Sequence, residues 1–275
     1  MAKFQKFSLV KSFDKMQTVL FHSTIFGPIH SRRLGTSLGV NLTPNDGKIC
    51  SFDCLYCEAG FNAQGPGTTG FAKRESVKAL LEDKLRSMKE KSERLDVITF
   101  SGNGEPTLHP DFAGIVADTI ALRNFYFPDV KISVLTNSTQ LHRKDVAEAL
   151  AKVDNNILKL DSAVESTLRA LDRPGSASFT PDYVIPQLQK FGNSAIIQTM
   201  FTRGEHKGKV IDNTTADEID ALIKAYRAIN PMEIMIYTID RPTPETTLKH
   251  ISKEELTCIA DEIVRRTGIP VQVSA

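Results

Sequence analysis

Apolar strand-like runs alternate with amphipathic helix-like segments along most of this chain of 275 residues. The segments predicted to be strands are residues 37–41, 97–101, 131–136, 157–161, 195–201 and 233–238, with a short last one at 270–273. The segments predicted to be helices are residues 75–93, 111–124, 143–151, 166–171, 181–191, 216–229 and 253–267. Strands that alternate with helices form a parallel sheet with right-handed crossovers, so the pattern predicts an α/β protein.

The number of strand–helix units bears on the architecture. Six main units indicate a barrel or a partial barrel with parallel strands, and a doubly wound open sheet is the alternative, between which periodicity alone does not choose. No internal repeat or long linker divides the sequence, so we expect a single domain over residues 1–275. Its core is expected at about 27–245, with N- and C-terminal extensions packed on it. In either architecture the active site is expected at the carboxyl ends of the strands.

The composition is that of a globular protein without a strongly charged partner. Apolar residues make up 41% and charged residues 24%, and the net charge is +1. No global field therefore draws the protein to nucleic acid or to an acidic membrane, although a local basic patch is allowed. The N-terminal residues lack the continuous apolar run of a signal peptide, and residues 19–29 are too short and too polar to span a bilayer. We expect a cytoplasmic protein with no membrane partner.

Three of the four cysteines lie in one short segment, CSFDCLYC. They are Cys50, Cys54 and Cys57, whereas Cys258 stands alone in a predicted helix, where a small core residue is the common role. Clustered thiols in a reducing compartment indicate a metal rather than a disulfide framework. A loop of this kind can surround one iron–sulfur cluster with three thiolates, and the lack of a fourth cysteine leaves one iron open for a substrate.

The spacing of these cysteines, with Tyr56 before the last one, resembles the signature of the radical S-adenosylmethionine superfamily. The resemblance implies that Cys50, Cys54 and Cys57 bind a [4Fe–4S] cluster and that Tyr56 belongs to the cofactor site. It also implies that S-adenosylmethionine chelates the fourth iron through its amino and carboxylate groups. An electron from a low-potential donor, such as flavodoxin or ferredoxin, would then release a 5′-deoxyadenosyl radical that abstracts hydrogen from a substrate.

A second motif, SGNGEPTLHP, follows the second predicted strand. Its glycines let the backbone turn sharply and approach a ligand, and Glu105 can accept hydrogen bonds from an ammonium group. The motif resembles the Gly-Gly-Glu element of the superfamily, although Asn103 stands between the glycines. This resemblance implies that Gly104 and Glu105, supported by Gly102, bind the methionine amino group. By itself, the segment also fits an ordinary turn between a strand and a helix.

Polar residues also follow the next predicted strands. Asn137 ends the third strand among other polar groups and is expected to face the cofactor. Asp161 ends the fourth strand, where its carboxylate either binds ribose hydroxyls, as the superfamily's ribose-contacting position does, or caps the next helix. Gln198 and Thr199 lie in the fifth strand, where many members contact adenine or carboxylate, but they belong to no recognisable motif.

Basic residues flank this core. Arg32 and Arg33 precede the first strand, where they either hold a phosphate or carboxylate or pair with surface acids. Arg241 lies in a proline-stiffened loop that is expected to close the mouth of the barrel. Residues 64–70, rich in Gly and Thr, are expected to form a flexible lid behind the cysteines.

Together, the segments SRRLG, SGNGEPTLHP and DRPTPE look like a branch of the superfamily distantly similar to the wybutosine-forming tRNA modification enzymes. The resemblance covers most of residues 27–245 and implies a partial (β/α)6 TIM-type barrel with parallel strands. The resemblance makes a tRNA nucleoside the first candidate substrate, with a peptide or a small metabolite as alternatives. The competing hypothesis is a non-catalytic binding module for RNA, in which Arg32 and Arg33 contact RNA. In that module His30 or His109 completes a zinc site, and the near-neutral charge weakens this hypothesis.

Overall fold

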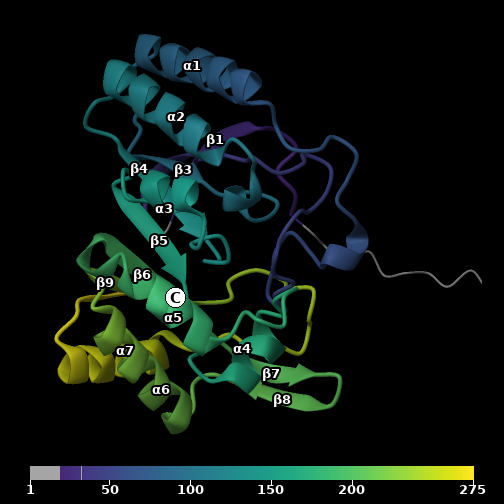
Figure 1. Ribbon diagram of the computed structural model, residues 1–275, viewed down its shortest axis with the longest axis vertical. Helices are drawn as coiled ribbons and strands as arrows, with labels where there is room; N and C mark the ends of the chain where they lie inside the picture. The colour runs from purple at the N-terminus through teal and green to yellow at the C-terminus, as the bar shows by residue number, and fades with distance from the viewer. Residues whose placement is uncertain (1–18, 32) are drawn as a thin grey trace, which may run out of the picture.

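The computed structural model of the protein describes residues 19–31 and 33–275, and Figure 1 shows the arrangement of their helices and strands. One curled sheet of eight strands has the order β1-β2-β3-β4-β5-β6-β9-β10. These strands are β1 (Ile25–Ser31), β2 (Gly35–Val40), β3 (Val97–Phe100), β4 (Lys131–Thr136), β5 (Asn155–Lys159), β6 (Ala195–Phe201), β9 (Glu233–Thr238) and β10 (Val271–Ser274). Every pair from β2 to β10 is parallel, and β1 runs antiparallel to β2.

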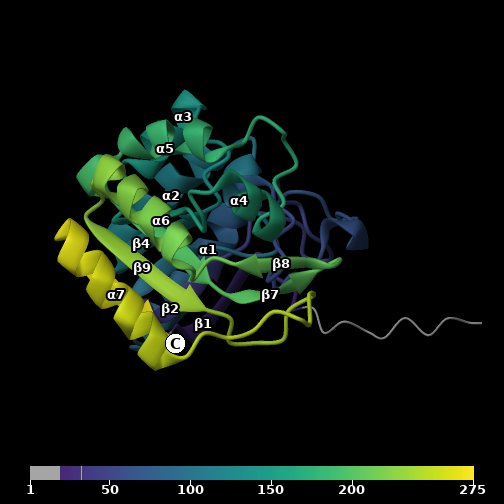
Figure 2. The same ribbon diagram turned by 90° about the horizontal axis from the view of Figure 1, so that it is seen from below.

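The helices follow one another around the outside of this sheet. They are α1 (Arg74–Glu90), α2 (Phe112–Tyr126), α3 (Lys144–Leu150), α4 (Glu165–Leu171), α5 (Pro181–Gln189), α6 (Ala216–Ile229) and α7 (Lys253–Thr267). Figures 1 and 2 show α1 and α2 toward one end of the sheet and α6 and α7 toward the other. The strand order never reverses, as it would in a doubly wound sheet. The prediction of a partial parallel barrel is therefore confirmed.

The helix boundaries follow from local sequence signals. Thr180, Thr215 and Ser252 are the N-caps of α5, α6 and α7, and each side chain accepts a hydrogen bond from a backbone N–H of the first turn. Asn230 and Gly268, both with left-handed backbone, end α6 and α7. These signals explain why the predicted helices agree closely with the observed ones. Among the helices described, none is long and apolar enough to cross a membrane.

Two strand features were not predicted. One is the edge strand β1, whose mixed burial and Pro28 hide its strand character in the sequence. The other is the hairpin of β7 (Arg203–His206) and β8 (Lys209–Asp212), which lies outside the main sheet. Lys207 and Gly208 form its two-residue turn, and both have positive φ. Three short 3-10 helices are η1 (Asn62–Gln64), η2 (Pro106–Leu108) and η3 (Gly192–Ser194).

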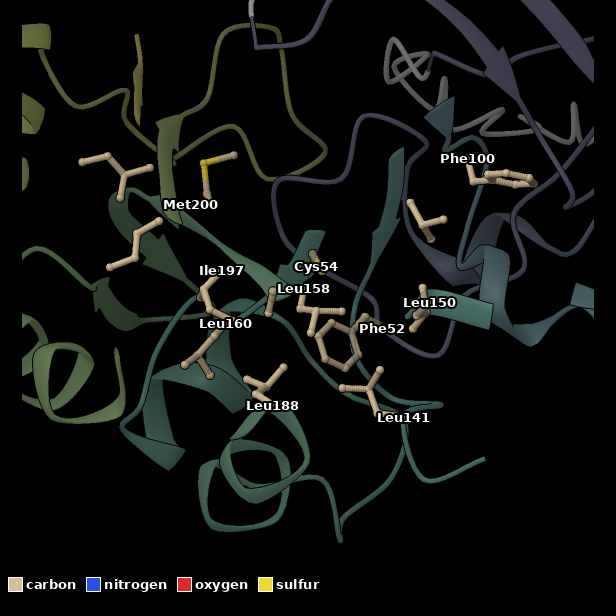
Figure 3. Packing of buried hydrophobic residues seen from close by; sticks show 14 of the residues in the cluster. Phe52, Cys54, Phe100, Leu141, Leu150, Leu158, Leu160, Leu188, Ile197 and Met200 are labelled. Carbon is tan, nitrogen blue, oxygen red and sulfur yellow. The ribbon is translucent and has the colours of Figure 1, made fainter. Parts of the chain in front are cut away.

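The main hydrophobic core lies between the sheet and the helices, and the cysteine segment is anchored in it. Phe52 and Leu55 are buried there, and the rings of Phe52 and Phe179 meet edge to face at 5.1 Å. Figure 3 shows Phe52 and Cys54 lying beside Leu158 of β5. Burying side chains of this size contributes about 2 kcal/mol each. The core therefore fixes the cysteine segment against the end of the sheet.

A second, smaller apolar cluster closes the inside of the barrel. Leu34, in the turn between β1 and β2, packs with Leu135 against three buried residues of β5, β6 and β9, namely Ile157, Ile196 and Met235. The predicted C-terminal extension, beyond residue 245, contains helix α7 and strand β10, and β10 joins the same sheet. Residues 1–18 of the predicted N-terminal extension lie outside the described residues.

Candidate functional site

A cavity of about 350 Å³ opens at the carboxyl ends of the parallel strands. It is lined by all of the residues predicted to bind metal or cofactor except Asp161. These lining residues are Cys50, Cys54, Cys57, Tyr56, Gly102, Gly104, Glu105 and Asn137. The structure therefore brings together two motifs that lie about fifty residues apart in the sequence.

The backbone of the cysteine segment is held by contacts that do not involve the thiols. The N–H groups of Asp53 and Leu55 donate to carbonyl groups at the end of α4, at 3.1 and 3.0 Å. Asn62 donates from its side chain to the carbonyl groups of Cys50 and Phe52, at 3.3 and 3.0 Å. The path of the segment is thus set by protein contacts on both sides of Cys54.

Burial raises the pKa of two of the thiols. Burial, together with the charge of Glu105, raises the pKa of Cys50 to about 12. Burial and the neighbouring Asp172 raise the pKa of Cys54 well above its ordinary value. Because iron binds the thiolate form, a metal must displace these protons when it binds.

A buried lysine, which the sequence analysis did not single out, lies beside the cysteines. The side chain of Lys48 is 2% exposed, its ammonium donates to the carbonyl group of Gly60 at 2.7 Å, and it lies 3.8 Å from the carboxylate of Asp53. Burial acts to lower the pKa of Lys48, but Cys57 and the other two cysteines outweigh burial and raise it. Lys48 therefore places a positive charge beside the thiol segment. The sequence signal that could have identified Lys48 as a site residue is its position two residues before Cys50.

The second motif contacts the cysteine segment directly through its glycines. Gly104 forms a bridge with Ile49, and the N–H of Glu105 donates to the Ile49 carbonyl at 3.0 Å. A Cβ at Gly104 would lie 1.8 Å from the Ile49 carbonyl oxygen, and one at Gly102 would lie 2.1 Å from Asn41 Oδ1. Only glycine permits such close approach, so both glycines are needed for packing.

Asn103, between the two glycines, ties the N-terminal side of the chain to the site. It accepts a hydrogen bond from the Phe21 N–H at 2.8 Å and donates to the carbonyl groups of Phe21 and Pro44, at 2.9 and 2.8 Å. The departure from the Gly-Gly-Glu pattern therefore has a structural role, because it places Phe21 in the cavity wall.

Glu105 is buried, and hydrogen bonds fix its carboxylate. One oxygen accepts from the hydroxyl of Thr136 at 2.6 Å and from the N–H of Thr107 at 3.0 Å, and the other accepts from the N–H of Asn137 at 2.7 Å. Burial raises the pKa of Glu105, although these hydrogen bonds oppose it. The Asn137 side chain in turn reaches Cys50 Sγ at 3.6 Å. The two motifs and the end of β4 thus form one connected network.

Asp161 does not line the cavity as the ribose prediction requires. Its side chain is fully buried behind Tyr56, whose hydroxyl donates to it. It also accepts from the N–H of Met200 at 2.9 Å and pairs with Lys159 at 3.3 Å. With its oxygens engaged in this way, Asp161 orients Tyr56 and Lys159 instead of facing a ligand.

Lys159, Asp172 and Tyr237 complete this network and were not identified from the sequence as site residues. The Lys159 ammonium donates to the hydroxyls of Tyr56 and Tyr237, at 2.6 and 3.3 Å. The Tyr56 hydroxyl also lies 3.2 Å from Asp172 Oδ1. Burial, and then the neighbouring Asp161, raises the pKa of Asp172. These residues come from different elements, so only the fold brings them together.

The histidines considered for zinc are used otherwise. His109 Nε2 bonds to the carbonyl of Ala72 at 2.6 Å, and its Nδ1 accepts from the N–H of Asp111 at 3.0 Å. His30 is exposed on the edge strand β1. Within residues 19–31 and 33–275, no three His, Cys, Asp or Glu side chains meet around one point, as a single metal ion would require. Cys50, Cys54 and Cys57 all line the cavity, and in an iron–sulfur cluster each thiolate binds a different iron.

Of the other residues considered in the sequence, some lie at the cavity and others lie away from it. Arg33 lines the cavity, and Arg241 pairs with Glu58 at the mouth at 2.7 Å. Arg32 lies outside the described residues. Cys258 is exposed on α7, contrary to the core position expected for it, because the buried face of that helix is formed by other residues. The Gly/Thr-rich segment is bound to the carboxylate of Asp46 and does not line the cavity.

Comparisons with known proteins agree with this geometry. The profile of the radical SAM superfamily matches residues 45–180, which contain both motifs. A UPF0026 protein of Methanocaldococcus jannaschii is 31% identical over 257 residues, covering 89% of this chain and 73% of that protein. A protein named GTPase Obg from Brachyspira hyodysenteriae is 27% identical over 247 residues, but this chain spans only 34% of its length.

Solved structures show the same fold at low identity. SuiB of Streptococcus suis bound to S-adenosylmethionine has a TM-score of 0.61 and 17% identity, covering 86% of this chain and 50% of SuiB. The wybutosine enzyme TYW1 with a lysine–pyruvate adduct has a TM-score of 0.57 and 15% identity, covering 84% of this chain and 74% of TYW1. By its family match and its UPF0026 relatives, the chain belongs to the radical SAM superfamily.

Proposed function

We propose that this protein is a radical S-adenosylmethionine enzyme with a [4Fe–4S] cluster bound by Cys50, Cys54 and Cys57. The observation that carries the proposal is the direct contact between Ile49 and Gly104, which fixes the cysteine segment and the glycine motif on one cavity. When bound, the cluster supplies the electron that cleaves S-adenosylmethionine to a 5′-deoxyadenosyl radical, which takes hydrogen from the substrate.

The residues around the cavity have separate tasks in this proposal. Gly104 offers backbone to the methionine amino group, and the carboxylate of Glu105 attracts its charge. Asn137 donates toward Cys50, and Lys48 offsets the negative charge of the thiolates. Such contacts from surrounding residues tune a metal site. The buried walls keep water from the reacting atoms.

The substrate and the electron donor remain proposals from the superfamily. A low-potential donor such as flavodoxin or ferredoxin would reduce the cluster, and a cytoplasmic location suits that donor. A tRNA nucleoside is the first candidate substrate, ahead of a peptide or another small metabolite. The zinc-stabilised RNA-binding module is less well supported, because both nitrogens of His109 already have partners and His30 is exposed.

Anaerobic reconstitution with iron and sulfide tests the proposal. The loaded protein, reduced in the presence of S-adenosylmethionine, is expected to form 5′-deoxyadenosine, measured by chromatography and mass spectrometry. Cys54→Ala should lose the cluster, whereas the matched control Cys258→Ala should keep it because that thiol is exposed on α7. Zinc without sulfide in protein purified anaerobically, or a loaded protein that forms no 5′-deoxyadenosine, would overturn the proposal.

A further inference from the structure

Two buried nitrogen atoms at the cavity have no hydrogen-bond partner among the residues the structure describes. They are Arg33 Nη1 and Gln198 Nε2, and both side chains line the cavity. Gln198 as a whole is only 5% exposed. Buried polar groups in proteins are nearly always hydrogen-bonded, so two such donors at one cavity indicate a ligand that accepts hydrogen bonds.

Arg33 is held in place by the turn that contains it. The hydroxyl of Ser31 accepts from the N–H groups of Arg33 and Leu34, at 3.3 and 3.2 Å. On the other side, Gln272 of β10 donates to the Arg33 carbonyl at 3.2 Å, so the turn joins the two edges of the curled sheet. The guanidinium lies 4.5 Å from the centre of the Tyr237 ring. Within the part of the chain that the structure describes, its position is therefore fixed without an ion pair to an acid.

The strand register places Gln198 near this arginine. Gln198 pairs with Met235, and Met235 pairs with Gln272, which holds the Arg33 carbonyl. Neighbouring strands are about 4.8 Å apart, so the Gln198 side chain starts about two strand spacings from Gln272. Leu34, adjacent to Arg33, also packs in the apolar cluster that contains Met235. Both unpaired nitrogens thus belong to the same side of the cavity.

The charged groups around Arg33 and Gln198 favour the binding of an anion. Lys159 lines the same cavity, but its ammonium is already paired with Asp161. Glu58 is paired with Arg241. Among the residues in the described ranges Arg33 has no salt-bridge partner, although Glu58 and Asp240 line the adjoining pocket with it, so its guanidinium can still bind an anion. A guanidinium and an amide N–H₂ are both donors, which match the oxygens of a carboxylate or phosphate.

We propose that Arg33 and Gln198 bind an anionic group of the substrate. This inference rests on the proposed function, because that function makes this cavity the active site. The substrate is thereby a compound that carries a carboxylate or a phosphate. The cofactor's own carboxylate is the other possible source of this chemistry. The residues proposed for its methionine group follow β3 and β4, whereas Gln198 lies in β6 and Arg33 in the turn between β1 and β2. Because members of the superfamily also contact the cofactor from the fifth strand, which is β6 here, the test below compares binding with and without S-adenosylmethionine.

Saturation-transfer NMR on the reconstituted, oxidised full-length protein tests this site. Acetate and methylphosphonate are the probes, and acetamide is the neutral control. Each is measured first without and then with an excess of S-adenosylmethionine. We expect transfer to one or both anions and much less to acetamide. Arg33→Met should weaken binding about tenfold and Gln198→Leu about fivefold, since each removes a hydrogen bond to a charged group. Arg265→Met, at an exposed position on α7, is the matched control, and it should leave binding unchanged.

The outcomes separate the possible ligands. Stronger binding of acetate indicates a carboxylate substrate, and stronger binding of methylphosphonate indicates a phosphate. Equal signals from the protein and from Arg33→Met would mean surface binding only and overturn the inference. Displacement of both anions by S-adenosylmethionine would assign the site to the cofactor and overturn it too. If Arg33→Met does not fold, Arg33→Lys, which keeps the charge but loses the forked geometry, should bind the anions more weakly.

The NMR measurement of anion binding does not depend on turnover by the enzyme. Failure of the wild-type protein to form 5′-deoxyadenosine would count against the proposed function, whereas anion binding is measured without reduction. A protein that forms 5′-deoxyadenosine but binds neither anion would retain the proposed function and lose this inference.

Discussion

The contact between the two motifs can be tested with a single methyl group. In Gly104→Ala the new Cβ would lie 1.8 Å from the Ile49 carbonyl oxygen, whereas real Cβ contacts below 3.0 Å are essentially never found. The two backbones must therefore separate by about 1.2 Å, the difference between these distances. Because Ile49 is adjacent to Cys50, the separation displaces the first thiol from the glycine motif.

The cost follows from two terms. Forcing a methyl group into a packed site costs about 1–3 kcal/mol, and the hydrogen bond from the Glu105 N–H to Ile49 contributes about 1 kcal/mol more. We expect Gly104→Ala to lower the free energy of unfolding by about 2–4 kcal/mol. A misplacement of about 1 Å at a reacting centre also costs about a hundredfold in rate. Formation of 5′-deoxyadenosine should fall by about that factor.

Urea unfolding and a timed assay of 5′-deoxyadenosine measure the two effects. Gly175→Ala is the matched control, since its Cβ would meet the carbonyl of Ser51, also adjacent to Cys50, at an ordinary 3.4 Å. It should change the free energy of unfolding by no more than about 0.5 kcal/mol. If Gly104→Ala unfolds and reacts like the control, the contact with Ile49 does not position the site.

Four further outcomes are expected. Lys48→Met should lower the midpoint potential of the cluster, because the reduced cluster loses a neighbouring positive charge. EPR-monitored titration measures this potential, and Lys144→Met, at an exposed site, should leave it unchanged. Asn103→Ala should cost about 3 kcal/mol and speed hydrogen exchange at Phe21, since three hydrogen bonds are lost; unchanged exchange would contradict this role. Burial raises the pKa of Glu218 in the folded protein above its ordinary value of 4.5. The proton is therefore bound more tightly in the folded protein, and the stability that this adds is full below pH 4.5 and is lost as the pH rises through the raised pKa. Glu218→Gln should therefore gain stability relative to wild type as the pH rises, and a constant difference in unfolding free energy would refute this. Removal of iron by a chelator should leave a folded protein with a cooperative unfolding transition.

The sequence predicted those parts of the fold that depend on local patterns. The helices carry apolar residues at helical spacing and caps at their ends, as in α1, where Val77, Leu81, Leu85 and Met88 are buried on one face. The parallel strands are apolar because both faces are covered. Strand β1 carries neither pattern, since it lies at an edge and pairs through its backbone alone. The hairpin of β7 and β8 is too polar to stand out.

The candidate site was predictable only where a motif carries it. The cysteines and Glu105 were identified by spacing and by neighbouring residues. Asp161 was placed at the correct strand end, but periodicity does not tell whether a side chain faces the cavity or lies behind Tyr56. Gln198 was noted without an assigned role, because its unpaired nitrogen becomes meaningful only when Arg33 is brought to the same cavity.

Contacts with the rest of the fold hold the cysteine segment on several sides. Phe52 and Leu55 are buried in the main core, Ile49 is bonded to the glycine motif, and Asp53 is bonded to the end of α4. Small zinc domains, in contrast, fold only when the metal binds. Here the main core buries Phe52 and Leu55, and burial also raises the pKa of Cys50. Because iron binds the thiolate form, cluster binding would have to release the proton of a thiol whose pKa is raised by the same burial that anchors the segment.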